Sequence, residues 1–476
     1  MAYNHGIRIQ ENPTSVAAPI TNESGVPVVF GTAPVNMAAT PAVNKPILCN
    51  TFAEAQAAFG YSDDYANYTL CQAMDAFFKV FGVAPVVFVN VLDPATHKTE
   101  YAEELTVAAG QAKTTKKGVI LDGLTVSDGG TALVSGTDYT TEFEADGTLV
   151  ITVLKDGVTA LSLSGSQLDP AAVKATDIIG SHDASTGVET GMELVRQVYP
   201  TFNLVPNLLL APGWTSTPEV GIALAAKCQN INGVFSCECV VDLDTTTVKK
   251  YTDVAKAKTE AGYDVFNRMI CVWPKVKYAG KIFDYSAFYA AMCLYTDANN
   301  DSVPNLSPSN KPLGVSATVL ADGTEVVLDV IQANVLNAAG IVTAINVNGF
   351  KAWGNNTAAY PALTDPKDRW ICCRRFFSWW GNSFITTYFN KVDDPANYRL
   401  IESIVDSENV RGNSLVSQGK CAGIKMVYNE ADNPIENVVA GRIVFRQFLA
   451  PYTPAEDILN ILEFDVSMIQ AALGGE

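Results

Sequence analysis

Histidine is scarce in this sequence, which contains only three histidines among its 476 residues. His5, His97 and His182 all lie outside the segments that we expect to form an α/β body. A Ser-His-Asp triad in that body would therefore have no histidine base. The G-x-S-x-G elbow, a G-x-G-x-x-G turn after a strand and the P-loop are absent as well. We expect a protein that builds or binds, not an enzyme.

Cysteine spacings typical of zinc sites are also lacking, although the chain has ten cysteines. Cys237-x-Cys239 and Cys372-Cys373 have neither the two-residue spacing nor the second pair that a structural zinc site requires. Most of the ten lie in apolar runs such as Met269–Trp273, where a free cysteine behaves as a small buried hydrophobic residue. We expect reduced, buried thiols, no metal and no cofactor.

Positive charge is in deficit, with 32 basic against 50 acidic residues and a net charge of −18. Binding to phosphates needs clustered basic side chains, and those here are scattered, so we expect no nucleic-acid partner. The densest basic group, Arg369, Arg374 and Arg375, lies among aromatic residues and is interpreted as a salt-bridged structural face. Five carboxylates at a strand end or in turns are interpreted as solvated: Asp242, Asp244, Asp297, Asp393 and Asp394.

Long apolar runs are missing too. No uninterrupted run approaches the roughly 20 residues that a membrane-spanning helix needs, so we expect no direct membrane insertion. The first residues lack the charged region and apolar run of a secretory signal peptide. Together with the reduced thiols, this pattern favours a protein made in a cytoplasm.

The main feature that is present is an alternation of apolar strands and amphipathic helices. Continuous apolar runs predict strands that are covered on both faces, as in a parallel sheet. Their alternation with helices predicts a doubly wound α/β fold. The predicted strands are Val26–Gly31, Val86–Val91, Leu204–Ala211, Cys237–Leu243 and Arg268–Trp273, and the predicted helices include Val248–Ala261 and Tyr285–Tyr295.

Two regions depart from this alternation. Residues 99–188 are rich in Gly, Thr, Ser and Val, with recurring turn pairs such as Asp122-Gly123 and Asp146-Gly147. Short alternating strands with Asp-Gly turns predict a small β-sandwich or barrel, inserted into the α/β fold. After about Phe350 the pattern predicts a long helix, Tyr398–Gln418, followed by strands at Gly423–Tyr428 and Gly441–Leu449.

Each end of the chain carries an isolated strand pattern. Ile7 and Ile9 alternate with Arg8 near the N-terminus, and Leu462, Phe464 and Val466 alternate with acidic residues near the C-terminus. Before the second strand, Thr453–Glu456 has the form of a capping box and predicts a short helix. These strands either pair within the chain or are donated to neighbouring subunits by β-augmentation, and the pattern alone leaves both possibilities open.

A series of motifs in a fixed order resembles a known protein family. At the N-terminal end these are Gly6-Ile-Arg8, Pro13–Val16, Gly31–Pro34, Asn44–Pro46, Tyr68–Leu70 and Pro85–Val91. At the C-terminal end they are Cys373–Arg375, Trp379–Asn382, Asp393–Pro395, Asn397–Ile401, Asp406–Asn409, Arg411–Asn413, Leu449–Glu456 and Leu462–Asp465. The sequence thereby resembles the tail sheath proteins of contractile (myovirus-type) bacteriophages and of phage-derived contractile bacteriocins.

The resemblance implies a multidomain α/β plus β fold, with a subtilisin-like α/β domain, an inserted β-sandwich, a C-terminal α+β domain and strand-like terminal arms. The likeness to subtilisin concerns the fold only and agrees with the missing histidine. Combined with the patterns above, it gives an N-terminal linking arm (1–20), an N-terminal part of the α/β core (21–98), the insert (99–188), the subtilisin-like domain (189–349), the C-terminal domain (350–452) and a C-terminal linking arm (453–476).

The resemblance also implies a structural function. Subunits would polymerise as stacked rings around a tail tube, and the sheath would contract to drive the tube through a target cell envelope. The partners would be further copies of the chain, the tail tube protein, and baseplate and tail terminator proteins, in a virion tail made in the bacterial host cytoplasm. The implied contact residues are Ile7, Arg8 and Ile9 in one arm, Leu462, Phe464 and Val466 in the other, and Arg411, Lys420, Lys425, Arg442 and Arg446 facing the tube.

Two other classes of function compete with this interpretation. One is a non-catalytic or degenerate subtilisin-like hydrolase, which the missing histidine base opposes. The other is a β-rich surface or adhesive protein, suggested by the insert and opposed by the missing signal peptide. Within the sheath interpretation, a phage tail and a bacteriocin stay equally open, and a type VI secretion sheath is disfavoured because that system usually divides its sheath between two chains.

Overall fold

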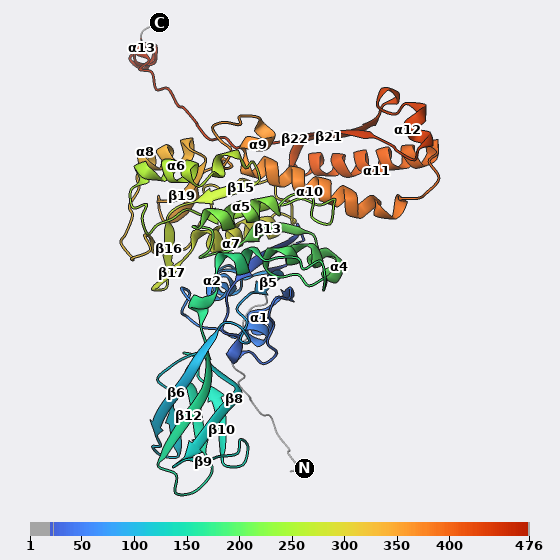
Figure 1. The fold of residues 1–476 in the computed structure, drawn as a ribbon. Coiled ribbons are helices and arrows are strands. Elements are labelled where there is room, and N and C mark those ends of the chain that lie inside the picture. Colours follow the sequence, from blue (N-terminus) through green and yellow to red (C-terminus); the bar gives the residue numbers. More distant parts are fainter. Residues whose placement is uncertain (1–19, 22, 475–476) are drawn as a thin grey trace, which may run out of the picture.

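The computed structural model of the chain describes residues 20–21 and 23–474. It shows three parts: a central α/β body, a β-rich insert that projects from one end of the body, and a layer of helices and a hairpin at the other end (Figure 1). The mixed α/β, multidomain fold expected from the sequence is confirmed.

The body is organised around one large sheet. Among the described residues it has eight strands in the order β20-β19-β15-β14-β13-β2-β5-β3, and the six inner strands are parallel. The edge strands β3 and β20 are antiparallel. The strands are β2 (Val26–Gly31), β3 (Ile47–Cys49), β5 (Val86–Asn90), β13 (Pro206–Leu210), β14 (Glu238–Asp242), β15 (Met269–Val272), β19 (Ile341–Asn346) and β20 (Phe350–Trp353).

Every residue of β2, β5, β14 and β15 is buried, which explains why apolar residues dominate these strands; the polar exceptions, Asn90, Glu238 and Asp242, lie at strand ends. Helix α7 (Tyr285–Ala298) is itself almost completely buried against the sheet. The other main helices of the body are α1 (Phe52–Phe59), α2 (Thr69–Met74), which continues into a π-helical turn at Asp75–Phe81, α5 (Pro218–Ala226), α6 (Tyr251–Glu260) and α8 (Val330–Ala338).

Smaller elements complete the body. Strand β1 (Ile20–Thr21) pairs in parallel with β4 (Val83–Ala84). Strand β16 pairs antiparallel with both β17 and β18. These and the remaining short helices are β16 (Lys275–Tyr278), β17 (Lys281–Phe283), β18 (Ala317–Val319), α3 (Ala175–Ile179) and α4 (Val198–Phe202).

The insert consists of two packed sheets with a core of their own. One sheet has the order β6-β12-β8-β9 and the other the order β10-β11-β7. Tyr101, Val126, Leu149, Ile151 and Leu161 are buried between them. The strands are β6 (Lys98–Thr106), β7 (Gln111–Lys113), β8 (Val119–Asp128), β9 (Thr131–Ala132), β10 (Tyr139–Phe143), β11 (Leu149–Val153) and β12 (Ala160–Leu168).

The first and last strands of the insert, β6 and β12, pair along nine residues, from Lys98 opposite Leu168 to Thr106 opposite Ala160. The chain therefore enters and leaves the insert at neighbouring points. Such a unit can be placed in a connection of the body without displacing the elements on either side.

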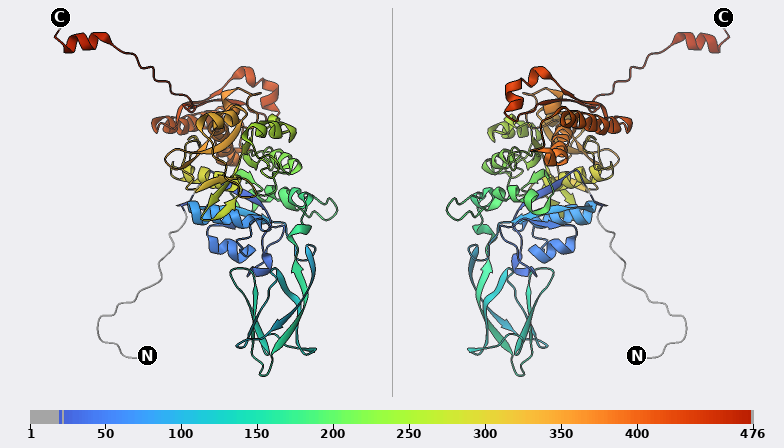
Figure 2. Two further views of the ribbon diagram at one scale, coloured as in Figure 1. Left: turned by 90° about the vertical axis from the view of Figure 1, so that its left-hand side faces the viewer. Right: turned by 90° about the vertical axis from the view of Figure 1, so that its right-hand side faces the viewer.

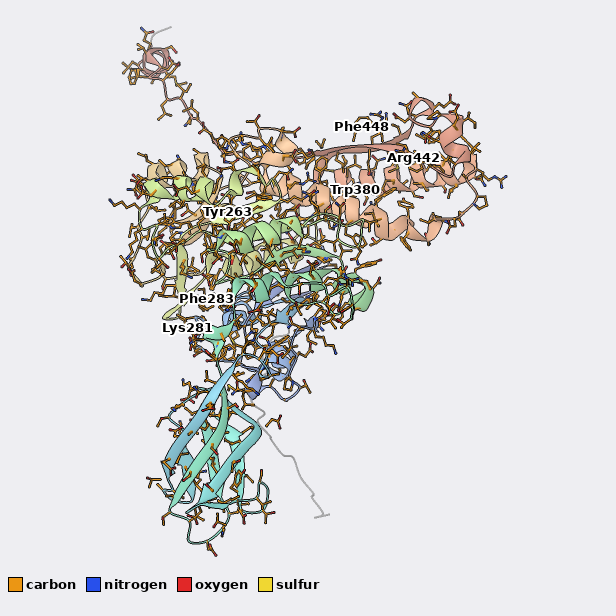
Figure 3. The ribbon with its side chains drawn as sticks, viewed as in Figure 1. Tyr263, Lys281, Phe283, Trp380, Arg442 and Phe448 are labelled. Atoms are coloured by element: carbon orange, nitrogen blue, oxygen red, sulfur yellow. The ribbon has the colours of Figure 1, made fainter. Side chains whose placement is uncertain are left out.

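The C-terminal layer packs two helices against a hairpin. Phe376 and Trp380 of α10 share a small apolar core with Leu415 of α11 and with Cys421 and Ile424 of β21. The elements are α9 (Pro366–Arg369), α10 (Ile371–Tyr388), α11 (Tyr398–Ser417), β21 (Cys421–Tyr428), α12 (Ile435–Val439) and β22 (Phe445–Pro451). Figure 3 shows Trp380 on α10 and Phe448 on the hairpin within this layer.

The last segment corrects two expectations. Tyr452–Asp465 forms neither the helix predicted after Thr453 nor the strand predicted at Leu462, and α13 (Val466–Ala472) begins where the strand should end. The local reason is a better cap, because the Asp465 carboxylate accepts a hydrogen bond from the Ser467 amide at 2.8 Å. Figure 2 shows this segment projecting away from the body.

Candidate assembly and tube-facing surfaces

The basic group Arg369, Arg374 and Arg375 joins the C-terminal layer to the body. Arg375 of α10 forms a bidentate ion pair with Asp297 of α7, and only 4% and 1% of the two side chains are exposed. Burial raises the pKa of Asp297, and Arg375 opposes that shift. Burial alone would lower the pKa of Arg375, but the negative charge of Asp297 outweighs burial and raises this pKa. Asp297 is thus buried and paired, so its interpretation as a solvated carboxylate is wrong.

A second buried charge lies beside this pair. Glu238, at the start of β14, contacts Arg268 at 3.1 Å and accepts a hydrogen bond from Ser378 of α10 at 2.5 Å. Arg374 contacts Asp368 at 3.1 Å, and its Nε lies 3.8 Å from Glu238. The expected salt-bridged face is confirmed, and its partners show that α10 is fixed to the sheet by charge as well as by apolar packing.

The carboxyl edge of the parallel strands is where an enzyme of this architecture would place its site. Asp242 ends β14 there, and its carboxylate accepts a hydrogen bond from the Ser286 amide at 2.8 Å. Asp242 is buried, so its interpretation as a solvated carboxylate is also wrong. Burial, followed by repulsion from Asp284, raises its pKa to about 7. Lys275 forms an ion pair with Asp284 beside it.

Among the residues that the structure describes, no histidine lies at this edge to act as a general base. His97 lies in the turn after β5 and accepts a hydrogen bond from the Asp93 amide, whereas His182 lies beside Glu189, 3.3 Å away. His5 falls outside the described residues. In the part of the chain that the structure describes, no group of three or more His, Cys, Asp and Glu side chains is arranged to hold a metal ion.

The titration of Asp242 gives a testable pH dependence. Its pKa is about 7 in the folded chain against an ordinary value of 3.8. Between these values the folded state retains a proton that the unfolded state has lost, so stability falls as pH rises from about 4 to 7. Above about pH 7 the full free-energy cost of burying the ionised Asp242 carboxylate is present. Asp242→Asn removes it and is expected to stabilise the chain by about 1–3 kcal/mol at pH 8, and by less at pH 5.

Urea unfolding at the two pH values measures this difference. Asp244→Asn is the matched control, because hydrogen bonds from Thr246 and Thr247 outweigh burial and lower the pKa of Asp244. The control should show no gain at high pH. Equal pH dependence in the parent and in Asp242→Asn would show that Asp242 stays ionised in the folded chain.

The cysteines are where the sequence places them. All ten are free and buried, which confirms the expectation of reduced, buried thiols. Burial raises the pKa of most of them, for example to about 12 for Cys71 and Cys271. Such thiols are poor nucleophiles, because the thiolate is the reactive form.

The five residues expected to face the tube have different surroundings. Arg411 contacts Glu408 at 2.6 Å and lies 3.9 Å from the Trp380 ring, and Arg446 forms an ion pair with Asp432. Lys420 is only 9% exposed, and its ammonium contacts Asp301 and Asn300. This burial argues against Lys420 as a tube contact.

Lys425 and Arg442 differ from these three. Both side chains are exposed, and neither forms an ion pair with any residue that the structure describes. Arg442 lies near the tip of the hairpin (Figure 3). Of the five candidates, these two have the side chains most free to meet a partner.

The structure describes the expected arm residues of the C-terminal end. Leu462 and Phe464 are 87% and 80% exposed, and Val466 lies in α13 and not in a strand. Ile7, Arg8 and Ile9 fall outside the described residues. Within the described ranges, the structure thus places the C-terminal arm in solvent without an intramolecular strand partner.

The C-terminal layer exposes several apolar side chains that the sequence patterns did not predict. Phe448 of β22, Ile435 and Val439 of α12 and Val410 of α11 all expose most of their side chains. The alternation of half-buried and exposed residues along Phe445–Pro451 identifies Phe448 as outward-facing. The sequence of this strand, FRQFLAP, does not itself alternate between apolar and polar residues, so it holds no signal that could have identified Phe448 as exposed. In the described part of the chain, no helix is long and apolar enough to cross a membrane.

Comparison with known proteins tests the overall interpretation. No protein-family model matches the chain. The tail sheath protein of Burkholderia phage BcepMu is 29% identical over 493 aligned positions, which cover 99% of each chain. Two solved structures share the fold: a chain of the anti-feeding prophage baseplate, with a TM-score of 0.59 and 14% identity, and one of the sheath complex of the extracellular contractile injection system PVC in its contracted state, with 0.57 and 16%.

Both structural matches cover 98% of this chain, and they cover 100% and 99% of the respective neighbours. The match to the phage protein likewise includes the insert and both terminal segments. The resemblance to tail sheath proteins that the ordered motifs indicated is therefore confirmed: along almost its whole length the chain is similar to a phage tail sheath protein, and it shares the fold of both solved chains.

Proposed function

We propose that this chain is a tail sheath subunit that polymerises as stacked rings around a tail tube, and that the sheath contracts to drive the tube through the envelope of a target cell. One observation carries the proposal: the C-terminal segment exposes a dense series of apolar side chains. Soluble monomers rarely expose such a segment, because its burial against a partner is favourable. Its exposed members are Ile458, Leu459, Ile461, Leu462, Phe464, Val466, Met468, Ile469 and Leu473.

Neighbouring subunits are the proposed partners of this segment. The hairpin β21–β22 is a two-stranded sheet within the described residues, so each strand has an unpaired edge. Such edges accept a further strand through main-chain hydrogen bonds. Residues around Leu462, Phe464 and Val466 would supply one strand, and residues around Ile7, Arg8 and Ile9 of another subunit a second. These bonds would keep the lattice connected while rigid bodies change their relative positions.

The remaining assignments follow from the geometry of such a particle. The C-terminal layer would face the tube, with Lys425 and Arg442 as its principal contacts and with Arg411 and Arg446 held by internal ion pairs. The insert would face outward, where an added unit disturbs the lattice least. Baseplate and tail terminator proteins would bind the two ends of the sheath. The particle would be a phage or bacteriocin tail made in the host cytoplasm.

The finer description of the body as subtilisin-like belongs to the same proposal. The parallel sheet with helices on its faces supports a relationship in fold. At the carboxyl edge, Asp242, Asp284 and Lys275 are engaged with one another and with Ser286 and Gln72. We propose that this edge has a structural role only.

Negative-stain electron microscopy of the purified chain tests the proposal directly. The full chain is expected to form wide hollow tubes or sheets, and a chain that ends at Ile461 is expected to stay monomeric. The truncated chain should keep the thermal stability of the parent, because Leu462–Leu473 is exposed and adds little to the core. Monodisperse monomers from both chains at high concentration would overturn self-assembly.

A further inference from the structure

The C-terminal arm does not leave the body directly after β22. The arm root, defined here as Tyr452–Asp457, still lies against the body. The thiol of Cys373 lies 3.9 Å from the carbonyl oxygen of Tyr452. Pro454–Asp457 then form one wall of a cavity of about 660 Å³, whose other walls include Asn334 of α8 and Trp353 of β20.

Within the arm root, Glu456 makes the polar contacts. One oxygen of its carboxylate accepts a hydrogen bond from Nη2 of Arg369 at 3.0 Å. The other oxygen accepts one from Nδ2 of Asn355 at 3.3 Å. Because both oxygens are engaged from different directions, the carboxylate is fixed in orientation as well as in position.

The two donors are themselves held in place. The Arg369 guanidinium lies between the rings of Tyr360 and Trp370, 4.4 and 3.9 Å from their centroids. Its Nε donates to Oδ1 of Asn356 at 2.9 Å. Asn355 is buried, and its Oδ1 accepts a hydrogen bond from Ser307 at 2.5 Å. Little side-chain freedom is lost when such preorganised donors bind a carboxylate.

Beyond the arm root the contacts end. Within the described chain, Ile458–Phe464 makes no hydrogen bond or ion pair with the body, and Leu459 is 79% exposed. The transition from held to free backbone therefore falls directly after Glu456 and Asp457. The same contact explains why Thr453–Glu456 does not start a helix, since its glutamate is engaged by the body.

We propose that Arg369 and Asn355 clamp Glu456 and thereby fix the point and direction at which the C-terminal arm leaves the subunit. The clamp limits the volume that the arm can search, which raises its effective concentration at one neighbouring position. Arg369, Asn355 and Glu456 are thus positioning residues for strand donation. The significance of the clamp for assembly rests on the proposed function, but its effect on the isolated chain does not.

A distance measurement on the unassembled chain tests the clamp. Spin labels at Lys256→Cys on α6 and Leu459→Cys on the arm report where the arm leaves, and the ten native cysteines are buried. The parent is expected to give a narrow distance distribution. Glu456→Gln and Arg369→Met should each broaden it about twofold or more. Arg369→Lys keeps the charge but loses the planar fork and should give an intermediate width.

Asp457→Asn is the matched control, because this neighbouring acid forms no ion pair with any described residue. It should keep the parent distribution, and both Asp457→Asn and Glu456→Gln should keep the parent melting temperature, since the ion pair of Glu456 is partly exposed. A Glu456→Gln distribution as narrow as that of the parent would overturn the clamp.

Assembly provides the second readout. The concentration needed for tube formation is expected to rise about three- to tenfold in Glu456→Gln, because more of the arms are misdirected. Parent tubes with an unchanged threshold in Glu456→Gln would contradict the clamp but not the sheath assignment. If the parent chain forms no tubes but Glu456→Gln still broadens the distance distribution, the result would support the clamp and contradict self-assembly.

Discussion

Asp297→Ala is expected to lower the free energy of unfolding by about 3–5 kcal/mol, because it leaves Arg375 buried without a counter-charge. Only 4% of the Arg375 side chain is exposed, and the Asp297 carboxylate accepts hydrogen bonds from both Nη atoms of its guanidinium. In solvent the guanidinium would recover its hydration, but here water cannot reach it without separating α10 from α7. The C-terminal layer should therefore loosen first.

Urea denaturation followed by tryptophan fluorescence measures this loss, because Trp379 and Trp380 lie on α10 beside the pair. The matched control is Glu260→Ala, which breaks an exposed ion pair with Lys256 and should cost less than about 0.5 kcal/mol. Asp297→Leu combined with Arg375→Met removes both charges and should cost less than Asp297→Ala alone. A loss as small as that of the control would show that Arg375 finds another partner.

The sequence predicts the central sheet well because the signal there is local. Val26–Gly31 is predicted and observed with the same bounds, and the predicted Cys237–Leu243 exceeds the observed β14 by one residue at each end. A parallel strand buried on both faces is apolar at most positions, so a short apolar run between turns or helices indicates it, even where buried polar residues such as Glu238 and Asp242 lie at its ends. The long helix is also local: it is predicted at Tyr398–Gln418 and observed at Tyr398–Ser417.

The sequence does not predict which charges are buried. Asp297 and Arg375 are 78 positions apart, and nothing near either residue indicates that they meet. Asp242 resembles any acid at the end of a strand, and only the packing of α7 against that strand removes it from water. A carboxylate is interpreted as solvated by default, because burial without a partner is costly, and the partner is a tertiary feature.

In the C-terminal segment the opposite happens: local sequence patterns predict a helix and a strand, but contacts elsewhere in the chain, or the lack of a strand partner, prevent both from forming. Thr453–Glu456 has the residues of a capping box, but Arg369 and Asn355 bind the glutamate. Leu462–Val466 has the alternation of a strand, but a strand needs a partner for its backbone groups, and the described part of a single chain offers none. A sequence pattern can indicate a strand whose partner lies in another molecule.

Phe464→Asp is expected to raise the concentration needed for tube assembly at least about tenfold, and to leave the isolated chain as stable as the parent. The isolated chain is unaffected because 80% of this side chain is already exposed. In the lattice the phenylalanine would be buried against a neighbour, which contributes about 1.5–3 kcal/mol at each contact. Replacing it with a carboxylate both removes that contribution and places a charge in an apolar contact.

The positions at which substitutions weaken assembly distinguish a donated extended strand from a segment that the neighbouring subunit encloses on all sides. In a donated strand, side chains alternate between faces, so Leu462→Asp should act like Phe464→Asp while Glu463→Gln should assemble as the parent does. Asp465→Asn is a second control, because asparagine also caps a helix and should preserve α13. Light scattering and electron microscopy on this series measure the threshold. If Glu463→Gln and Phe464→Asp raised the assembly threshold equally, the result would argue against an extended strand. In a strand, neighbouring side chains point to opposite faces, whereas a segment enclosed on all sides is sensitive at every position.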